Sequence, residues 1–336
     1  MEDTLTPDDL QRFIPFDELS LTAVQELIPH FHVSHTAAGK VLFKRGTRDD
    51  ECHFLLEGTL DLADESFKVI TIQGDAEENL LALDASHPVH RSAAITKTAC
   101  TIASIKRSHF QLISTWVELS GDLPDDEDTD WLETLLTSDL FSHFPPSNIQ
   151  QLLTRLEERE VVLGDVIVKE GDIASECFVL KIGRAVVTRS SNQHVTTLAA
   201  LGSGALFGED ALISQLPRSA SVTMSSDGVI MALSKENFDS LMKTPVLEYI
   251  SESELPELME NSEVGVVILD VRNQHESAAS PVLHARQVAL SELRSLIPKL
   301  SPDFLYIVAG ETRAEAAAYI LTEAGLDVRV LSYSSQ

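Results

Sequence analysis

The chain has 336 residues, 43% of them hydrophobic and 23% charged, which is the composition of a globular protein with room for two or three domains. Its formal net charge of −28 repels the phosphates of nucleic acids and anionic lipids, so we expect no nucleic acid partner. No apolar run approaches the roughly 18 residues of a membrane-spanning helix, so we expect no membrane insertion. The acidic N-terminus lacks the apolar core of a signal peptide, and three widely spaced cysteines fit a reducing compartment. The expected location is therefore the cytoplasm.

The sequence contains an internal repeat. Gly39–Gly46 recurs as Gly164–Gly171, and Glu51–Gly58 recurs as Glu176–Gly183, with the same separation of 125 positions. The upstream apolar residues keep this separation at helical spacing: Phe16, Val24, Leu27 and Ile28 correspond to Phe141, Ile149, Leu152 and Leu153. Each copy starts with amphipathic helices and continues as short strands between glycine turns, the pattern of a small antiparallel barrel or jelly roll.

The repeat predicts two domains of the same fold, at residues 1–120 and 132–248. Residues 121–131 between them are acidic and nearly free of apolar side chains, so we interpret them as a linker.

The stretch 207–222 interrupts the strands of the second copy. It contains Gly208, whose missing side chain lets the backbone approach a ligand, followed by the carboxylate of Glu209 and a short helical turn. A lone arginine, Arg218, stands nine positions after Glu209. A guanidinium can neutralise an anion through two parallel hydrogen bonds, and a carboxylate can accept hydrogen bonds from a sugar hydroxyl. One ligand that carries a phosphate and a ribose would satisfy all of these groups.

This stretch resembles the phosphate-binding cassette of cyclic nucleotide-binding domains, the module of the bacterial catabolite activator protein and of protein kinase A regulatory subunits. The resemblance rests on Phe-Gly-Glu at 207–209 and Arg-Ser-Ala at 218–220. It implies that Glu209 takes the ribose 2′-hydroxyl and that Arg218 takes the cyclic phosphate, with help from backbone amides of the short helix. The ligand-binding residues that it implies are Gly208, Glu209, Asp210, Ala211, Arg218, Ser219 and Ala220. We expect cAMP as the ligand, and Ser219 leaves cGMP open.

The corresponding cassette of the first copy, residues 78–93, has lost the ribose carboxylate. The alignment puts Asn79 in place of Gly208 and Leu80 in place of Glu209, while Arg91-Ser92-Ala93 is kept. Removing the carboxylate removes a charge-assisted hydrogen bond worth about 1.5–3 kcal/mol. We therefore expect a degenerate domain without ligand, which contacts the second copy or forms a homodimer.

Three histidines of the first copy, His30, His32 and His35, could suggest a metal site. No carboxylate or cysteine stands at ligand spacing beside them, so we interpret them as solvated strand residues and expect no metal. Cys52 and Cys177 occupy equivalent positions in apolar strands, where a buried and unreactive thiol is expected.

After the second copy the pattern changes to alternating helix and strand. A Ser-capped helix at 234–242 precedes this change, and Tyr249 just beyond it is a candidate to approach the base of the nucleotide. The elements expected next are a helix at 253–259, strands at 264–270 and 304–308, a helix at 313–324 and a strand at 328–331. Buried strands that alternate with helices predict a small α/β domain at 249–336.

Leu-Asp-Val-Arg at 269–272, the segment 284–290 and the strand that leads into Arg313 resemble a rhodanese domain. Alignment on Arg313 puts the catalytic cysteine of that family at Val308, its loop glycine at Glu311 and its last loop serine at Ala314. Sulfur transfer needs a thiolate, and no cysteine follows Cys177. We therefore predict a rhodanese-like domain without catalytic residues, kept as a surface that binds a protein partner.

The sequence thus predicts a multidomain protein: two cyclic nucleotide-binding β-barrels with flanking helices, then a small α/β domain. The predicted function is a non-enzymatic cytoplasmic cAMP receptor whose conformation, and whose binding to an unidentified protein partner, change with the ligand. Two alternatives stay open. One is a rhodanese-type sulfurtransferase or phosphatase gated by the nucleotide. The other is a cAMP-responsive transcription regulator, which would need a helix-turn-helix after the second barrel.

Overall fold

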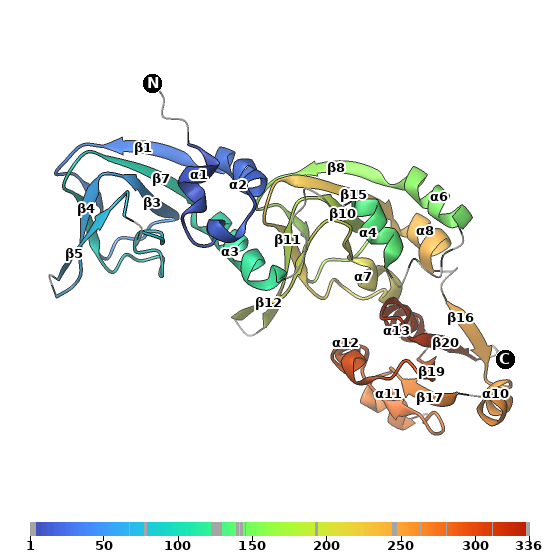
Figure 1. The fold of residues 1–336 in the computed structure, drawn as a ribbon. Coiled ribbons are helices and arrows are strands. Elements are labelled where there is room, and N and C mark those ends of the chain that lie inside the picture. The colour runs from blue at the N-terminus through green and yellow to red at the C-terminus, as the bar shows by residue number, and fades with distance from the viewer. Residues whose placement is uncertain are drawn as a thin grey trace.

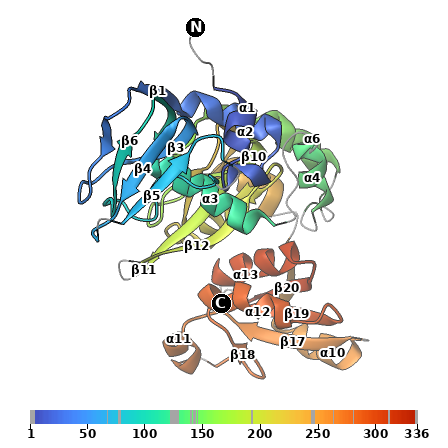
Figure 2. The ribbon, with the colours of Figure 1, turned by 60° about the vertical axis from the view of Figure 1, so that its left-hand side comes forward.

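The computed structural model describes residues 5–66, 68–76, 79–121, 130–138, 141, 144, 146–191, 194–243, 247–262, 264–279, 281–310 and 312–333. Two domains built of antiparallel sheets are followed by an α/β domain with a parallel sheet (Figure 1). The two barrels lie side by side (Figure 1), and the α/β domain lies against the second (Figures 1 and 2). Most of the predicted acidic linker, residues 122–129, falls outside the described residues. Within the described ranges, no helix is both long enough and apolar enough to cross a membrane.

The first barrel consists of two antiparallel sheets, in the orders β1-β7-β3 and β2-β6-β4-β5. Its strands are β1 (His32–Thr36), β2 (Val41–Phe43), β3 (Glu51–Glu57), β4 (Thr59–Ala63), β5 (Val69–Gln73), β6 (Ala93–Thr96) and β7 (Cys100–Lys106). Helices α1 (Pro7–Gln11) and α2 (Leu21–Leu27) start at Thr6 and Ser20, whose hydroxyls accept hydrogen bonds from free backbone N–H groups. Helix α3 (Arg107–Ser120) follows β7. Aromatic rings join helices to sheet, because the ring centroids of Phe13, Phe16, Phe31 and Phe110 lie 5.1–6.2 Å from that of Phe54.

The second barrel repeats this plan, with sheets in the orders β13-β10-β15-β8 and β12-β11-β14-β9. Its strands are β8 (Glu157–Val161), β9 (Val166–Val168), β10 (Glu176–Ile182), β11 (Ala185–Ser191), β12 (His194–Leu201), β13 (Leu206–Phe207), β14 (Ser221–Met224) and β15 (Gly228–Ser234). Its helices are α4 (Trp131–Thr137), α6 (Pro146–Arg155), α7 (Glu209–Ser214) and α8 (Lys235–Phe238). The pairing register shifts at the same place in both copies, between Leu55 and Glu57 and between Leu180 and Ile182. A shared irregularity of this kind supports the internal repeat.

The α/β domain is built on one parallel sheet in the order β16-β20-β19-β17-β18. Its strands are β16 (Glu248–Ser251), β17 (Gly265–Asp270), β18 (Arg286–Gln287), β19 (Phe304–Ala309) and β20 (Asp327–Ser332). Its helices are α10 (Leu255–Asn261), α11 (Gln274–Ala279), α12 (Leu293–Leu296) and α13 (Thr312–Glu323). The helices and strands predicted for this region are confirmed. Helix α13 lies on the face of the sheet that is turned toward the second barrel (Figures 1 and 2).

The three domains contact one another through buried side chains. Helix α3 packs on β12 of the second barrel, where the indole N–H of Trp116 donates to the backbone oxygen of Leu201 at 3.1 Å. Leu212 and Ile213 of α7 belong to the same apolar cluster as the alanines of α13. A change in the second barrel can therefore reach both neighbours through packed contacts.

Several smaller predictions can be compared with the structure. His32 and His35 are exposed on β1 as expected, whereas His30 ends a 3₁₀ helix and contacts Asp227 of the second barrel at 2.8 Å. Cys52 and Cys177 are buried as predicted. Burial raises the pKa of the Cys52 thiol to about 11 and that of Cys177 well above its ordinary value, so both thiols are unreactive. The cap predicted at Ser234 is also confirmed.

Candidate functional site

All seven residues predicted to bind the ligand lie around one cavity of the second barrel, with a volume of about 340 Å³. This volume is within the range of about 300–1,000 Å³ that is common for small-molecule sites. One wall of the cavity is apolar and comes mainly from strands β9, β11, β12 and β14: Val168, Val187, Leu198, Leu201 and Val222. The opposite end is polar and comes from the cassette. The structure brings the seven residues together, and their role in ligand binding stays a prediction.

The backbone of the cassette is fixed by Gly208 and by the short helix α7. Gly208 has a φ of +84°, and a Cβ at this position would lie 2.7 Å from Nη1 of Arg218. Only glycine satisfies both constraints without strain. Ala211, Leu212 and Ile213 are buried and hold α7 on the barrel, which turns the side chain of Glu209 inward.

Arg218 is a buried cation whose partners are backbone oxygens. It is 8% exposed, and its guanidinium donates to the carbonyl of Gly208 and, at 2.6 Å, to the carbonyl of Glu176. In the described part of the chain it forms no ion pair with a carboxylate. Burial lowers the pKa of this guanidinium, the expected result when a charge leaves water without full compensation. The guanidinium thus stands at the cavity with its charge available to an anion.

Glu209 is a buried carboxylate that is only half satisfied. It is 4% exposed, and its Oε2 has no hydrogen-bond partner among the described residues. Burial, together with the nearby carboxylates of Asp210 and Glu323, raises the pKa of Glu209 well above its ordinary value. Such an oxygen needs a donor, and a ligand hydroxyl could supply one.

The α/β domain contributes two charged residues that sequence reasoning missed. Arg294 of α12 reaches the cassette with Nη2, which lies 2.9 and 3.1 Å from the two oxygens of Asp210 and 3.4 Å from Glu209 Oε1. The same nitrogen lies 3.4 Å from Glu323 Oε2, at the end of α13. Three carboxylates of two domains therefore share one guanidinium, and both Arg294 and Glu323 line the cavity.

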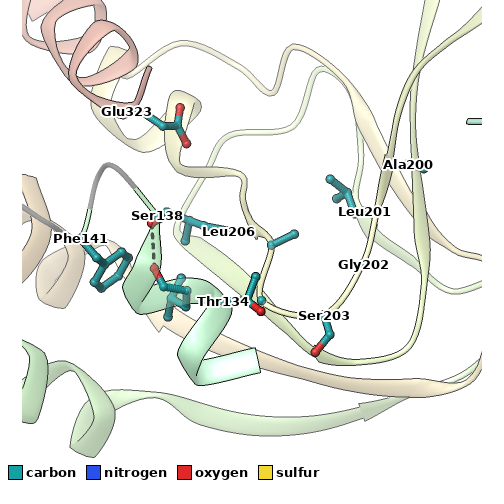
Figure 3. Close-up of a pocket in the computed structure, with 12 residues that line it drawn as sticks. Thr134, Ser138, Phe141, Ala200, Leu201, Gly202, Ser203, Leu206 and Glu323 are labelled. Carbon is teal, nitrogen blue, oxygen red and sulfur yellow. Dashed lines mark hydrogen bonds between the residues drawn. The ribbon is translucent and has the colours of Figure 1, made fainter. Parts of the chain in front are cut away.

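A second cavity of about 270 Å³ adjoins the first, because both are lined by Leu201, Leu206 and Glu323. Figure 3 shows it between helix α4 and the turn around Gly202, with the Glu323 carboxylate reaching toward it from α13. The Ser138 hydroxyl at its border donates to the backbone oxygen of Leu135 at 2.7 Å. The α/β domain thus closes one side of both cavities.

The first barrel has neither polar anchor at the equivalent positions. The backbone of Arg218 forms two hydrogen bonds, one with Gly171 and one with Asp172. In the first barrel, the backbone of His90 forms the corresponding two hydrogen bonds, with Gly46 and Thr47. His90, and not Arg91 as the sequence alignment indicated, therefore stands at the place of Arg218; Arg91 is exposed. Leu80 is 41% exposed, and residues 79–92 form turns instead of a helix.

Two further candidates lie elsewhere. Tyr249 does not line the cavity, because it belongs to β16 and its hydroxyl donates to Glu315 Oε1 at 3.1 Å. In the α/β domain Val308 is fully buried within β19, and Arg313 pairs with Glu276. Glu311, the predicted position of a loop glycine, lies outside the described residues.

The geometry of the second barrel can now be compared with known proteins. Residues 158–245 match the model of the cyclic nucleotide-binding domain. This segment contains all seven predicted ligand-binding residues. The chain is 25% identical over 240 residues to a cAMP-dependent protein kinase regulatory subunit of Yarrowia lipolytica, covering 71% of this chain and 61% of the relative. It is 26% identical over 229 residues to a cGMP-dependent protein kinase of Drosophila melanogaster, covering 67% of this chain and 20% of the kinase. This chain thus spans less than two thirds of either relative.

Two solved structures can also be compared with this chain, and both match it with low TM-scores. The regulatory domain of Toxoplasma gondii PKA, crystallised with cAMP, is 17% identical with a TM-score of 0.32, and the match covers 71% of this chain and 91% of that one. The catabolite activator protein of Thermus thermophilus is 28% identical with a TM-score of 0.29, over 37% of this chain and 54% of that protein. The segment that matches the family model, residues 158–245, contains the cassette, and Arg294 and Glu323 of the α/β domain also line its cavity.

Proposed function

We propose that the chain is a cyclic nucleotide receptor, that cAMP is its ligand, and that the second barrel holds the binding site. The observation that carries the proposal is a pair of incompletely satisfied groups at one cavity. Among the described residues, Arg218 is a buried cation without a carboxylate partner, and Glu209 is a buried carboxylate with an oxygen that lacks a donor. A buried cation favours the binding of an anion, and a carboxylate oxygen without a donor favours the binding of a hydroxyl. A ribose that carries a cyclic phosphate presents both groups on neighbouring atoms.

In the proposed complex the phosphate accepts hydrogen bonds from Arg218 and the ribose 2′-hydroxyl donates to Glu209 Oε2. Arg218 keeps its present contacts with the carbonyls of Gly208 and Glu176, which hold the guanidinium in place before the ligand arrives. A cation that is held in advance loses little side-chain freedom on binding. The apolar side chains of strands β11 and β12 that line the cavity would contact the base of the nucleotide. cGMP is the alternative ligand and is tested beside cAMP.

Helix α7 is the element that we propose couples ligand binding to the α/β domain. It carries Glu209 on one side, and its residues pack against α13 on the other. Arg294 adds a polar contact between α12 and the same helix. A ligand that pulls on Glu209 and Arg218 would shift α7 and change how the α/β domain docks. Coupling of this kind requires unequal affinity of the ligand for the two arrangements, typically 1–3 kcal/mol.

We propose that the α/β domain is rhodanese-like and that it acts as a surface for an unidentified protein partner rather than as an enzyme. Val308 supplies no thiolate at the expected position, and its side chain is fully buried. A transcription regulator is less favoured, because the described residues between 247 and 333 form an α/β domain instead of the helix-turn-helix that such a regulator needs. The three buried free thiols support a cytoplasmic location.

Calorimetric titration of the purified full chain with cAMP and with cGMP tests the proposed site. Arg218→Ala should weaken cAMP binding by about 2–5 kcal/mol, because the phosphate charge would be left unpaired in a partly closed cavity. Arg155→Ala is the matched control, since this arginine is exposed on α6 and should leave the affinity unchanged. Equal affinities of the Arg218 variant and the control would refute the assignment.

A further inference from the structure

A second cluster of polar side chains, two of them buried and one partly exposed, lies in the first barrel, outside the proposed nucleotide site. It consists of Asp49 in the turn before β3, His53 on β3 and His90 in the loop before β6. Asp49 Oδ2 lies 2.9 Å from His53 Nε2 and 3.3 Å from His90 Nε2. The three candidate ligand atoms lie within 4.8 Å of one another. Two imidazoles thus converge on one carboxylate oxygen.

These separations are close to those of a metal site. Zinc binds imidazole nitrogen and carboxylate oxygen at about 2.0–2.2 Å, so two ligand atoms of a tetrahedral site stand about 3.3 Å apart. The spacing of Asp49 Oδ2 from His90 Nε2 already equals that value, and the spacing from His53 Nε2 is shorter by a few tenths of an ångström. The third separation, between the imidazole nitrogens of His53 and His90, is at most 4.8 Å, so these two side chains would move together by up to about 1.5 Å to bind one tetrahedral ion.

The outer contacts of the cluster orient its three members. Asp49 Oδ1 accepts from the backbone N–H of Glu51 at 2.9 Å, which leaves Oδ2 for the cluster. His53 Nδ1 lies 2.7 Å from the hydroxyl of Ser104. Metal-bound histidines usually engage their second ring nitrogen in this way, and the contact fixes which nitrogen faces the metal.

The second ring nitrogen of His90 faces a carboxylate. The His90 side chain is 0% exposed, and its Nδ1 lies 3.5 Å from Asp84 Oδ2 without a hydrogen bond to any of the described residues. A metal on Nε2 would fix the proton on Nδ1, where Asp84 can accept it after a small closure. The ring of Phe43 stacks on His90 with centroids 3.7 Å apart and planes 7° apart, so the imidazole cannot turn away.

We propose that Asp49, His53 and His90 bind one divalent transition-metal ion of the zinc class. Two imidazole nitrogens and one carboxylate oxygen form a donor set typical of zinc and its neighbours, whereas calcium and magnesium take mainly oxygen ligands. Three protein ligands leave one coordination position for water. Asp49 is the most exposed of the three side chains, at 26%, and marks the side from which the ion enters. The site goes beyond the proposed nucleotide receptor and does not depend on it.

The position of His90 gives the site a structural meaning. The backbone of His90 occupies the position in the first barrel that Arg218 occupies in the second. The position proposed to bind a phosphate in the second barrel is thus proposed to bind a metal in the first. The ion would tie the degenerate loop that contains His90 to strand β3. Because an unfolded chain has no preformed site, binding would stabilise the folded first barrel.

Metal titration of the chelator-treated full chain tests the proposal. We expect one equivalent of Zn²⁺ to bind, and Co²⁺ to give the intense visible absorption of a tetrahedral site. His90→Gln, His53→Gln and Asp49→Asn should each weaken binding at least tenfold, and Asp84→Asn should weaken it about 10- to 100-fold through His90. His87→Gln is the matched control, because this histidine is exposed in the same loop and should leave the affinity unchanged.

Two outcomes would overturn the proposal: the absence of stoichiometric binding, or a loss of binding in the His87 control as large as in the cluster variants, which would indicate adventitious surface binding. Circular dichroism shows whether each variant folds. If the variants of the buried residues do not fold, anomalous scattering from a crystal of the wild-type chain grown with Zn²⁺ shows whether the ion binds at the cluster. A peak between the three side chains supports the site, and zinc found only at surface histidines contradicts it.

Discussion

Replacement of Glu209 by glutamine should stabilise the chain without nucleotide while it weakens nucleotide binding. Glu209 is buried, and its Oε2 has no hydrogen-bond partner in the part of the chain that the structure describes. Its pKa is raised well above the ordinary value of 4.5, first by burial and then by Asp210 and Glu323. The folded chain thus holds a proton at Glu209 more readily than the unfolded chain. The contribution of this carboxyl to stability is fully present below pH 4.5 and is lost as the pH rises toward the raised pKa. As the pH rises above 4.5, the unfolded chain releases this proton before the folded chain does, so folding becomes less favourable.

The magnitudes follow from the contacts of Glu209. A buried polar atom without a partner costs about 1–3 kcal/mol, and glutamine keeps the shape but removes the charge. We expect Glu209→Gln to raise the free energy of unfolding by about 1 kcal/mol at pH 7, which corresponds to a Tm higher by about 2–4 °C. The nucleotide loses a charge-assisted hydrogen bond from its ribose, worth about 1.5–3 kcal/mol, so Kd should rise about 10- to 150-fold.

Thermal unfolding at several pH values and calorimetric titration with cAMP measure the two effects on the same samples. The gain in Tm should be largest near pH 8 and should shrink as the pH falls toward 4.5. Glu236→Gln removes an exposed carboxylate on α8 and serves as the control for the substitution itself. A lower Tm at neutral pH with unchanged cAMP affinity would refute the reasoning, because Glu209 would then be only a structural partner of Arg294.

Three further substitutions test the surroundings of the site. Gly208→Ala should weaken cAMP binding at least tenfold by titration, because the residue has a φ of +84° and the new Cβ would displace Arg218; an unchanged Kd would show that the cassette tolerates the shift. Arg294→Ala should lower the free energy of unfolding in urea by about 1–2 kcal/mol and make the α/β domain more sensitive to proteolysis, since three carboxylates lose their shared partner. Arg294→Lys keeps the charge and should lose less; equal losses would assign the effect to geometry alone. Tyr319→Phe removes a buried hydroxyl that has no hydrogen-bond partner in the described ranges and should raise the free energy of unfolding by about 1 kcal/mol, whereas a loss of that size would reveal a hidden partner.

Local signals in the sequence were enough to predict much of the fold. The separation of 125 positions between glycine-rich segments predicted the duplicated barrel, because turns that need glycine recur wherever the same strands recur. The parallel α/β domain followed from buried strands that alternate with helices. The cassette residues 208–211 and 218–220 are close in sequence, so their clustering around one cavity followed from a single turn and a short helix.

The predictions failed where chain segments far apart in sequence come together. Arg294 reaches Glu209 from 85 positions away, and no local pattern indicates how two domains dock. The placement of Arg91 was wrong because the two cassettes differ in length, and only the backbone pairing of His90 with Gly46 shows the true correspondence. The cluster of Asp49, His53 and His90 was missed because His90 is 41 positions from Asp49 in the sequence. The sequence drew attention to closely spaced histidines instead, of which His32 and His35 are exposed.

The structure of a crystal soaked with cAMP tests the central claim most directly. We predict density for the nucleotide in the cavity of the second barrel, with its phosphate on the guanidinium of Arg218 and its ribose hydroxyl on Glu209 Oε2. A cavity without nucleotide at saturating cAMP, with both side chains turned to solvent or paired with protein groups, would contradict the claim that this chain is a cyclic nucleotide receptor.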